Sequence, residues 1–127
     1  MADSFAVQLD KILDDYSVQA KRAINNSMDV VAKEAVKKLK NSSPKRAGHG
    51  EYARGWGVKR SRGRNGINDV LVYNRTHGQL THLLENGHDV YNGKGGPFGR
   101  APAIKHIAPV EQWANSELPA EVERELE

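Results

Sequence analysis

Apolar residues recur at steps of three and four from Phe5 to Leu39, which is the period of an α-helix. Charged and amide side chains fill most positions between them, and neither proline nor glycine interrupts the run. Pro44 ends it, because proline cannot continue a helix and disfavours helical geometry at Ser43. The pattern predicts one long amphipathic helix over residues 1–41.

This helix is long for so short a chain. It would extend roughly 55 Å at 1.5 Å per residue, which exceeds the width of a compact domain of this size. Part of its apolar stripe therefore needs a partner, which is a second copy, another protein, or the same helix through a kink near Asn25 and Asn26. We expect packing against another chain.

Two runs rich in aromatic and β-branched residues, 52–61 and 67–74, predict a β-hairpin. The segment that joins them contains Asn65-Gly66, a common pair in hairpin turns. On the first run we expect Tyr52, Trp56 and Val58 to share one face. The second run is apolar on both faces at its centre, which predicts an interior strand covered on both sides. Before the hairpin, residues 44–51 are polar and contain glycine, and we expect a mobile loop.

Leu80, Leu83 and Leu84 have the spacing of a short helix, and Gly87 stands where its C-cap should be. A second hairpin is predicted from residues 88–91 to residues 103–107, around the glycine-rich loop 92–100.

A terminal helix is predicted from Pro109, since proline suits the first helical position. Trp113 is its expected anchor, and Pro119 should end or kink it, which leaves residues 120–127 as a frayed acidic turn.

Together these elements predict an α+β fold. The long N-terminal amphipathic helix packs on a small, mostly antiparallel sheet of two hairpins, with a short middle helix and a C-terminal helix. We expect one domain over residues 1–127, divided into the long helix 1–41, the loop 44–51, the sheet region 52–108 and the C-terminal helix 109–127.

Composition narrows the function classes. The 127 residues include no cysteine, which excludes disulfides and thiolate metal sites. No apolar run approaches the roughly 20 residues of a membrane span. The first residues lack the basic and apolar regions of a secretion signal. We expect a soluble intracellular protein with no membrane contact.

Charge is uneven along the chain. Residues 41–64 hold seven lysines and arginines against one acidic residue, whereas residues 109–127 hold six glutamates against one arginine. The basic segment is interleaved with Tyr52 and Trp56, which is a pattern seen in nucleic-acid binding. Head-to-tail pairing of copies, basic patch to acidic tail, explains the asymmetry equally well. A basic loop and an acidic helix that each face only solvent explain the asymmetry as well.

Two catalytic or metal interpretations are weak. His82, Glu85 and His88 are proper zinc ligands, but their spacing differs from that of the helical zinc-protease motif, and Gly87 should break the helix between them. A His–Asn–His nuclease would use His82, Asn86 and His88, or His77 and His106, yet no acidic cluster accompanies these residues. We expect no catalytic residue, no metal and no cofactor.

The glycine-rich loop does not match a phosphate-binding loop, because Lys94 is followed by Gly95 and Pro97 interrupts the run. It is either a plain surface loop or a hairpin tip that becomes ordered on a partner.

From Leu80 to Pro109 the chain resembles the tail-completion, or head–tail joining, family of lambda-like long-tailed bacteriophages, also described as minor capsid or neck proteins. Two blocks carry the resemblance: His82-Leu83-Leu84-Glu85-Asn86-Gly87-His88, and, after a glycine-rich spacer, His106-Ile107-Ala108-Pro109 followed by Glu111. The long N-terminal helix and the Tyr73-Asn74 edge of the hairpin also fit. The acidic C-terminal helix is shorter than in the family.

The resemblance implies a non-enzymatic virion protein, assembled in the bacterial host cytoplasm and located at the head–tail junction. It implies a homo-oligomer, a hexameric ring in the particle and a monomer when free. The expected partners are the head connector and the tail-terminator or tail-tube proteins, with non-specific contact to DNA in the lumen.

Two sets of residues follow from these arguments. The expected partner and self-association residues are Arg46, Arg54, Lys59, Arg60, Arg62, Arg64, Lys94, Phe98 and Arg100. The expected structural motif residues are Leu83, Leu84, Glu85, Gly87, His88, His106, Ile107, Pro109 and Trp113.

Overall fold

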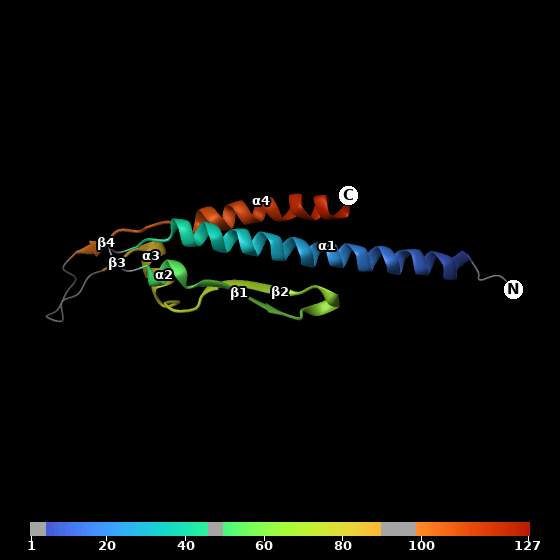
Figure 1. The fold of residues 1–127 in the computed structure, drawn as a ribbon, viewed down its shortest axis with the longest axis horizontal. Coiled ribbons are helices and arrows are strands. Elements are labelled where there is room, and N and C mark those ends of the chain that lie inside the picture. The colour runs from blue at the N-terminus through green and yellow to red at the C-terminus, as the bar shows by residue number, and fades with distance from the viewer. Residues whose placement is uncertain (1–4, 46–49, 90–98) are drawn as a thin grey trace.

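The computed structural model describes residues 5–45, 50–89 and 99–127 of the chain. Its spine is helix α1, Phe5–Ser42, with helix α4, Ile107–Leu126, on one side and the hairpin of strands β1 and β2 on the other (Figure 1). The short helices α2 and α3 lie at the C-terminal end of α1, while its N-terminal end projects beyond both neighbours (Figure 1). The α+β fold class predicted from the sequence is confirmed.

Helix α1 is continuous over 38 residues, so the prediction of one long helix is confirmed. It passes through Asn25 and Asn26 without interruption, which makes the kink alternative wrong. The two halves differ in environment: residues 6–19 are exposed, whereas Val31, Ala35 and Leu39 are buried. Packing of the exposed half against another chain stays a prediction.

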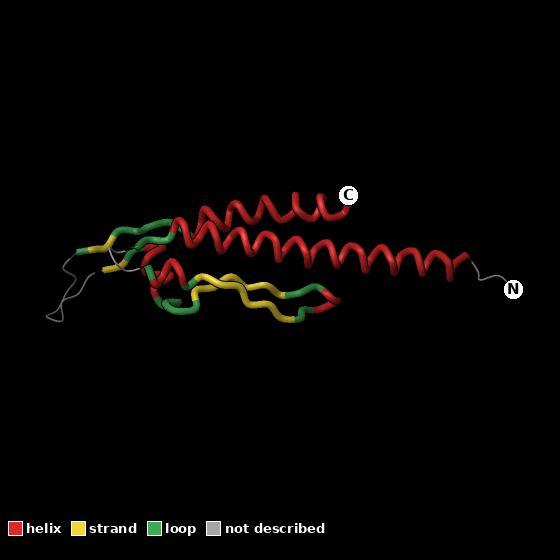
Figure 2. The backbone as a smooth tube through the Cα atoms, in the orientation of Figure 1, coloured by secondary structure: helices red, strands yellow, loops and turns green. Residues whose placement is uncertain are grey.

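The first hairpin is present with shorter strands than predicted (Figure 2). Strand β1, Trp56–Ser61, pairs antiparallel with strand β2, Asp69–Asn74, and Trp56 lies opposite Asn74. The connection includes a 3-10 turn, η1, Arg64–Gly66. Asn65 and Gly66 both have positive φ, 60° and 79°, which is why this pair suits the turn.

Two details of the hairpin prediction are wrong. Residues 51–54 form a helical turn, α2, Glu51–Arg54, which places Tyr52 outside the strand. Its ring is buried in the core, so tertiary packing overrides the β-propensity of this segment. Strand β2 is not interior either: it pairs only with β1 among the described residues, and Leu71 is 57% exposed.

Helix α3, Leu80–Asn86, and its cap Gly87 confirm the middle helix, with Gly87 at φ 76°. The second hairpin is confirmed in part. His88–Asp89 (β3) pairs antiparallel with Arg100–Ala101 (β4), whereas residues 103–106 form no strand. The reason is that Ile104 donates its backbone N–H to Leu84 of α3, which draws this segment onto the helix. Most of the glycine-rich loop and of the loop 44–51 lies outside the described residues.

Helix α4 begins at Ile107, two residues before the predicted start, and continues through Pro119 to Leu126. The prediction that Pro119 ends or kinks the helix, with a frayed turn after it, is therefore wrong. Helix α4 runs along α1, so tertiary contact supports it on both sides of the proline. Arg124 also bridges Glu117 and Glu121 across the same segment.

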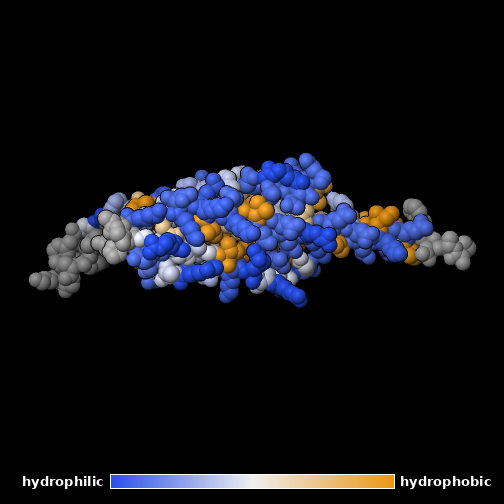
Figure 3. All heavy atoms as spheres, viewed as in Figure 1, coloured by the Kyte–Doolittle hydropathy of each residue, from blue (hydrophilic) through white to orange (hydrophobic). Residues whose placement is uncertain are grey.

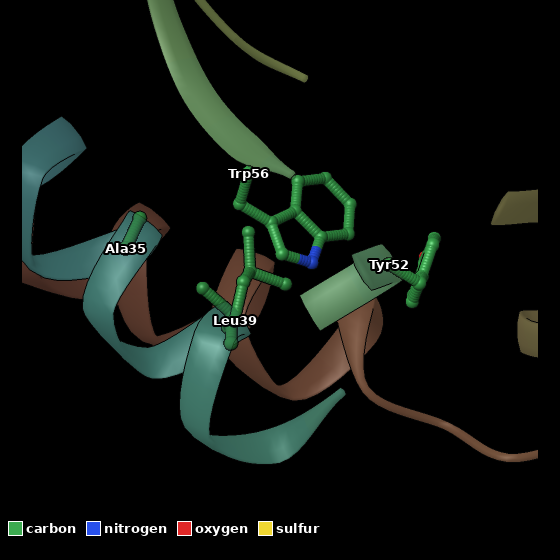
Figure 4. Close-up of a cluster of buried hydrophobic side chains, with 5 residues drawn as sticks. Ala35, Leu39, Tyr52 and Trp56 are labelled. Carbon is green, nitrogen blue, oxygen red and sulfur yellow. The ribbon is translucent and has the colours of Figure 1, made fainter. Parts of the chain in front are cut away.

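The core lies where α1, α2, β1 and α4 meet. Its buried members are Ala35, Leu39, Tyr52, Trp56 and Val110. Figure 4 shows Tyr52 and Trp56 beside Leu39, at the C-terminal end of α1. Trp113, the expected anchor of α4, packs against this cluster but is only partly buried, while Val110 is 7% exposed.

Candidate interaction surface

The two motif blocks of the sequence meet at the start of α4. The Glu85 carboxylate, in the last turn of α3, accepts the backbone N–H groups of His106, Ile107 and Ala108 at 2.9, 2.9 and 3.0 Å. The first N–H groups of a helix lack partners within it, and the helix dipole favours a negative charge there. Glu85 is therefore the N-terminal cap of α4, supplied from another helix.

His106 links this cap to the core. Its side chain is fully buried, with Nδ1 2.8 Å from the Ile104 carbonyl oxygen and 3.1 Å from Glu85 Oε1. Nε2 lies 2.7 Å from the Tyr52 hydroxyl. A neutral imidazole that donates from Nδ1 to Ile104 can accept the tyrosine O–H at Nε2. The contacts connect α2, α3 and α4 through one buried ring.

Two groups of this cluster have shifted pKa values. Burial acts to raise the pKa of Glu85, but the N–H donors of His106, Ile107 and Ala108 outweigh it, so the pKa is lowered; the His106 ring adds a smaller lowering when it is protonated. Burial raises the pKa of Tyr52; a hydrogen bond with Thr81 opposes this, and the Glu85 charge adds to it. The cluster therefore favours ionised Glu85 and neutral Tyr52.

Buried polar side chains hold Tyr52 and Trp56 in place. The Trp56 indole N–H donates to Ser43 Oγ at 2.7 Å, and Asn74 Nδ2 donates to the Tyr52 carbonyl oxygen at 2.6 Å. The Tyr52 ring meets the rings of Trp56 and His106 edge to face, with centroids 5.6 Å apart in both pairs. Sequence reasoning missed Ser43 and Asn74 as core residues; the Ser-Pro junction and the Tyr-Asn edge were the available signals.

A groove opens next to this core, between β2 and α4, with α1 at its floor. It has a volume of about 700 Å³. The apolar lining includes Leu39 of α1, Leu71 and Val72 of β2, and Val110 and Ala114 of α4. Figure 3 shows apolar side chains at the surface in the middle of the molecule. No sequence pattern predicted this groove, because its walls come from segments far apart in the chain.

A second apolar surface lies on the projecting half of α1, also visible in Figure 3. Leu9, Ile12, Leu13 and Tyr16 are 43%, 63%, 56% and 65% exposed. They are spaced by three and four residues, so they form one stripe, which is called the α1 stripe below.

The expected basic residues do not form one compact cluster. Arg60 is paired with Asp29 of α1, with 2.8 Å between Nε and Oδ1, and Arg100 with Asp89 at 3.3 Å. Lys59, Arg62 and Arg64 are exposed on the hairpin. Arg54 is exposed at the end of α2. Arg46, Lys94 and Phe98 lie outside the described residues.

The other expected motif residues lie in or near α3, β3 and the first turn of α4. Leu84 and Ile107 pack against the core, and Leu83 is 42% exposed. His88 lies in β3, and Pro109 is exposed in the first turn of α4.

The chemistry of a metal centre finds no support in the described parts of the chain. There, no three His, Cys, Asp or Glu side chains lie close enough to hold an ion. In the proposed His82, Glu85 and His88 set, both Glu85 oxygens already accept backbone hydrogen bonds.

None of the helices in residues 5–45, 50–89 and 99–127 is long and apolar enough to cross a membrane. A family model described as "Bacteriophage HK97-gp10, putative tail-component" matches residues 3–87. The match includes α1, the first hairpin and the block up to Gly87, and it ends before the second block at His106. No curated protein and no solved structure matches the chain.

Proposed function

Because the chain belongs to the HK97-gp10-like family of bacteriophage tail components, we propose that it is a non-enzymatic structural subunit that completes the tail or neck and joins head to tail. It acts as a ring of identical copies, hexameric in the particle, between the head connector and the tail-terminator or tail-tube proteins. Its place in the virion is the head–tail junction, after assembly in the host cytoplasm.

The observation that supports assembly is the α1 stripe. Four large apolar side chains, spaced along one face and each more than 40% exposed, form a surface that favours protein contact. Helix α1 is amphipathic over its whole length, but other elements cover only half of its apolar face. The uncovered half is therefore available to pack against another chain.

Deletion of the gene in the phage that encodes this protein tests the function. We expect filled heads and separate tails, and rescue by the wild-type protein supplied in trans. Electron microscopy and plaque counts measure both. Normal joined particles from the deletion phage would refute the proposal.

Light scattering across protein concentration, at low and moderate salt, tests the ring. A discrete oligomer supports self-assembly by the free protein. A monomer at every concentration refutes self-assembly in isolation and restricts the ring to the assembled particle.

A second function for the basic hairpin is contact with DNA phosphates in the lumen of the ring. Lys59, Arg62 and Arg64 are exposed on it. Phosphate contact would be independent of sequence and would weaken as salt rises. We expect weak, salt-dependent DNA binding that is lost when these three residues are neutralised; binding unchanged by neutralisation would refute it.

A further inference from the structure

The α1 stripe continues the covered face of the same helix. Ala23, Ser27 and Val31 are buried at steps of four along α1, and the stripe extends this row toward the N-terminus from Tyr16. The elements that pack on α1 end between the buried row and the α1 stripe. The C-terminal residues of α4, 125–127, lie beside residues 19–26 of α1, and the hairpin tip is bound at Asn25.

The groove between β2 and α4 has the complementary chemistry. Its lining is predominantly apolar and includes Leu71, which is 57% exposed on β2. An amphipathic helix that lays one face into an apolar groove is a recurrent mode of protein recognition. The stripe presents the repeated spacing that this mode requires.

The groove cannot be filled by the stripe of the same chain. Its floor is formed by Ala35 and Leu39, which lie about 30 Å along α1 from Tyr16 at 1.5 Å per residue. Helix α1 is continuous, so its N-terminal half cannot turn back. The stripe that enters a groove must come from another copy.

Charges around the two surfaces select the same arrangement. Residues 5–18, which carry the stripe, contain Asp10, Asp14 and Asp15 against one lysine. The outer face of the hairpin beside the groove is basic: Lys59 lies opposite Leu71, and the Arg75 guanidinium lies over Gly57. The opposite wall, α4, contributes Glu111 to the groove, so the acidic helix should lie with its aspartates toward the basic hairpin. This asymmetry fixes the orientation of the helix, and its negative charge disfavours pairing of two such helices.

We propose that the α1 stripe of one copy docks into the β2–α4 groove of a second copy. The two surfaces differ and lie at separate places on each chain, so every copy gives one helix and receives another. Such a heterologous contact generates a ring when its rotation closes. The inference deepens the proposed function, on which it rests, by assigning the surfaces of self-assembly.

Cross-linking of single-cysteine variants tests the contact, because the native chain has no cysteine. Ile12→Cys and Leu71→Cys proteins are mixed and treated with a short bismaleimide. We expect a cross-linked dimer from this mixture and much less from Val18→Cys with Leu71→Cys. Val18 is exposed at 54% but lies two residues from Tyr16, off the stripe. Circular dichroism checks that each variant is folded.

Either of two results would overturn the inference. If Ile12→Cys alone cross-links as efficiently as the mixture, two helices pair with each other instead. If neither mixture cross-links at concentrations where the wild type is oligomeric, the groove is not the receiving surface; if the wild type is monomeric throughout, complementation by Ile12→Asp decides. Independently, sedimentation should show self-association weakened at least tenfold by Ile12→Asp and by Leu71→Asp, but unchanged by Val18→Asp.

Complementation separates this inference from the proposed function. If Ile12→Asp restores head–tail joining to the deletion phage, the docking contact is wrong and the function stands. If the deletion phage makes normal particles, the function fails whatever the cross-linking result.

Discussion

Glu85 and His106 are 21 residues apart in sequence, yet the Glu85 carboxylate accepts the His106 backbone N–H at 2.9 Å and lies 3.1 Å from the ring nitrogen Nδ1. The contact fixes the start of α4 against the end of α3. Because α4 forms one wall of the groove, this pair also positions that wall.

Replacement of Glu85 by Gln should destabilise the fold by roughly 2 to 3 kcal/mol, because charge-assisted hydrogen bonds to the start of α4 are weakened. Urea unfolding measures the free energy. Glu111→Gln, an exposed acid just beyond the first turn of α4, is the matched control and should change it little. Equal effects of the two variants would contradict the capping role.

Stability should fall in acid through the same residue. The folded pKa of Glu85 is lowered from its ordinary value of 4.5, so the unfolded chain binds the proton more readily. The stability that Glu85 contributes is therefore present above pH 4.5 and is lost as the pH falls through the lower folded pKa. Urea unfolding at several pH values should show the difference between wild type and Glu85→Gln shrinking in acid. A difference that is constant with pH would argue against this linkage.

Ser43→Ala should cost about 1 to 2 kcal/mol, because it leaves the buried Trp56 indole N–H without its acceptor. Ser42→Ala is a close control. Both serine hydroxyls donate to the carbonyl four residues earlier, but Ser42 is exposed. Thermal unfolding followed by tryptophan fluorescence compares them, and equal melting temperatures would count against the Trp56 contact.

Asn25→Ala should release the hairpin tip from α1. The Asn25 side chain donates to the Gly66 carbonyl oxygen and accepts the Asn68 N–H, both at 2.9 Å. Amide hydrogen exchange should become faster in residues 64–68, with a loss of about 1 kcal/mol in stability. Asn26→Ala, at the exposed neighbouring position, should leave exchange there unchanged. Unaltered exchange in Asn25→Ala would show that the tip is held by other contacts.

Charge reversal of Arg62 and Arg64 to Glu should weaken self-association or head–tail joining, provided that the basic hairpin meets an acidic surface. Arg60 is better left in place, because its reversal would also break the ion pair with Asp29. Sedimentation and complementation measure the effect, with Lys33→Glu, exposed on α1, as the control. Wild-type assembly by the double variant would remove these arginines from the interface.

The sequence by itself determined the elements that depend on local chemistry. The repeat of apolar residues specified α1 and α3, and Gly87 and Asn65-Gly66 specified turns that need positive φ. These signals lie within a few residues of each other, so no knowledge of the rest of the chain was needed. The two motif blocks could also be recognised in the sequence, but the sequence did not show that Glu85 of the first block caps the helix that begins at the second.

Only the tertiary structure decided the features that depend on contacts between distant segments of the chain. It placed Tyr52 in a helical turn, carried α4 through Pro119, left β2 exposed at Leu71, and joined Glu85 to His106. These outcomes depend on groups brought together from segments 20 or more residues apart, and no local period encodes such a meeting. The groove is a surface of the same kind, since burial is a property of the folded chain. The sequence predicted an apolar stripe on α1, and only the folded chain shows which part of it stays exposed.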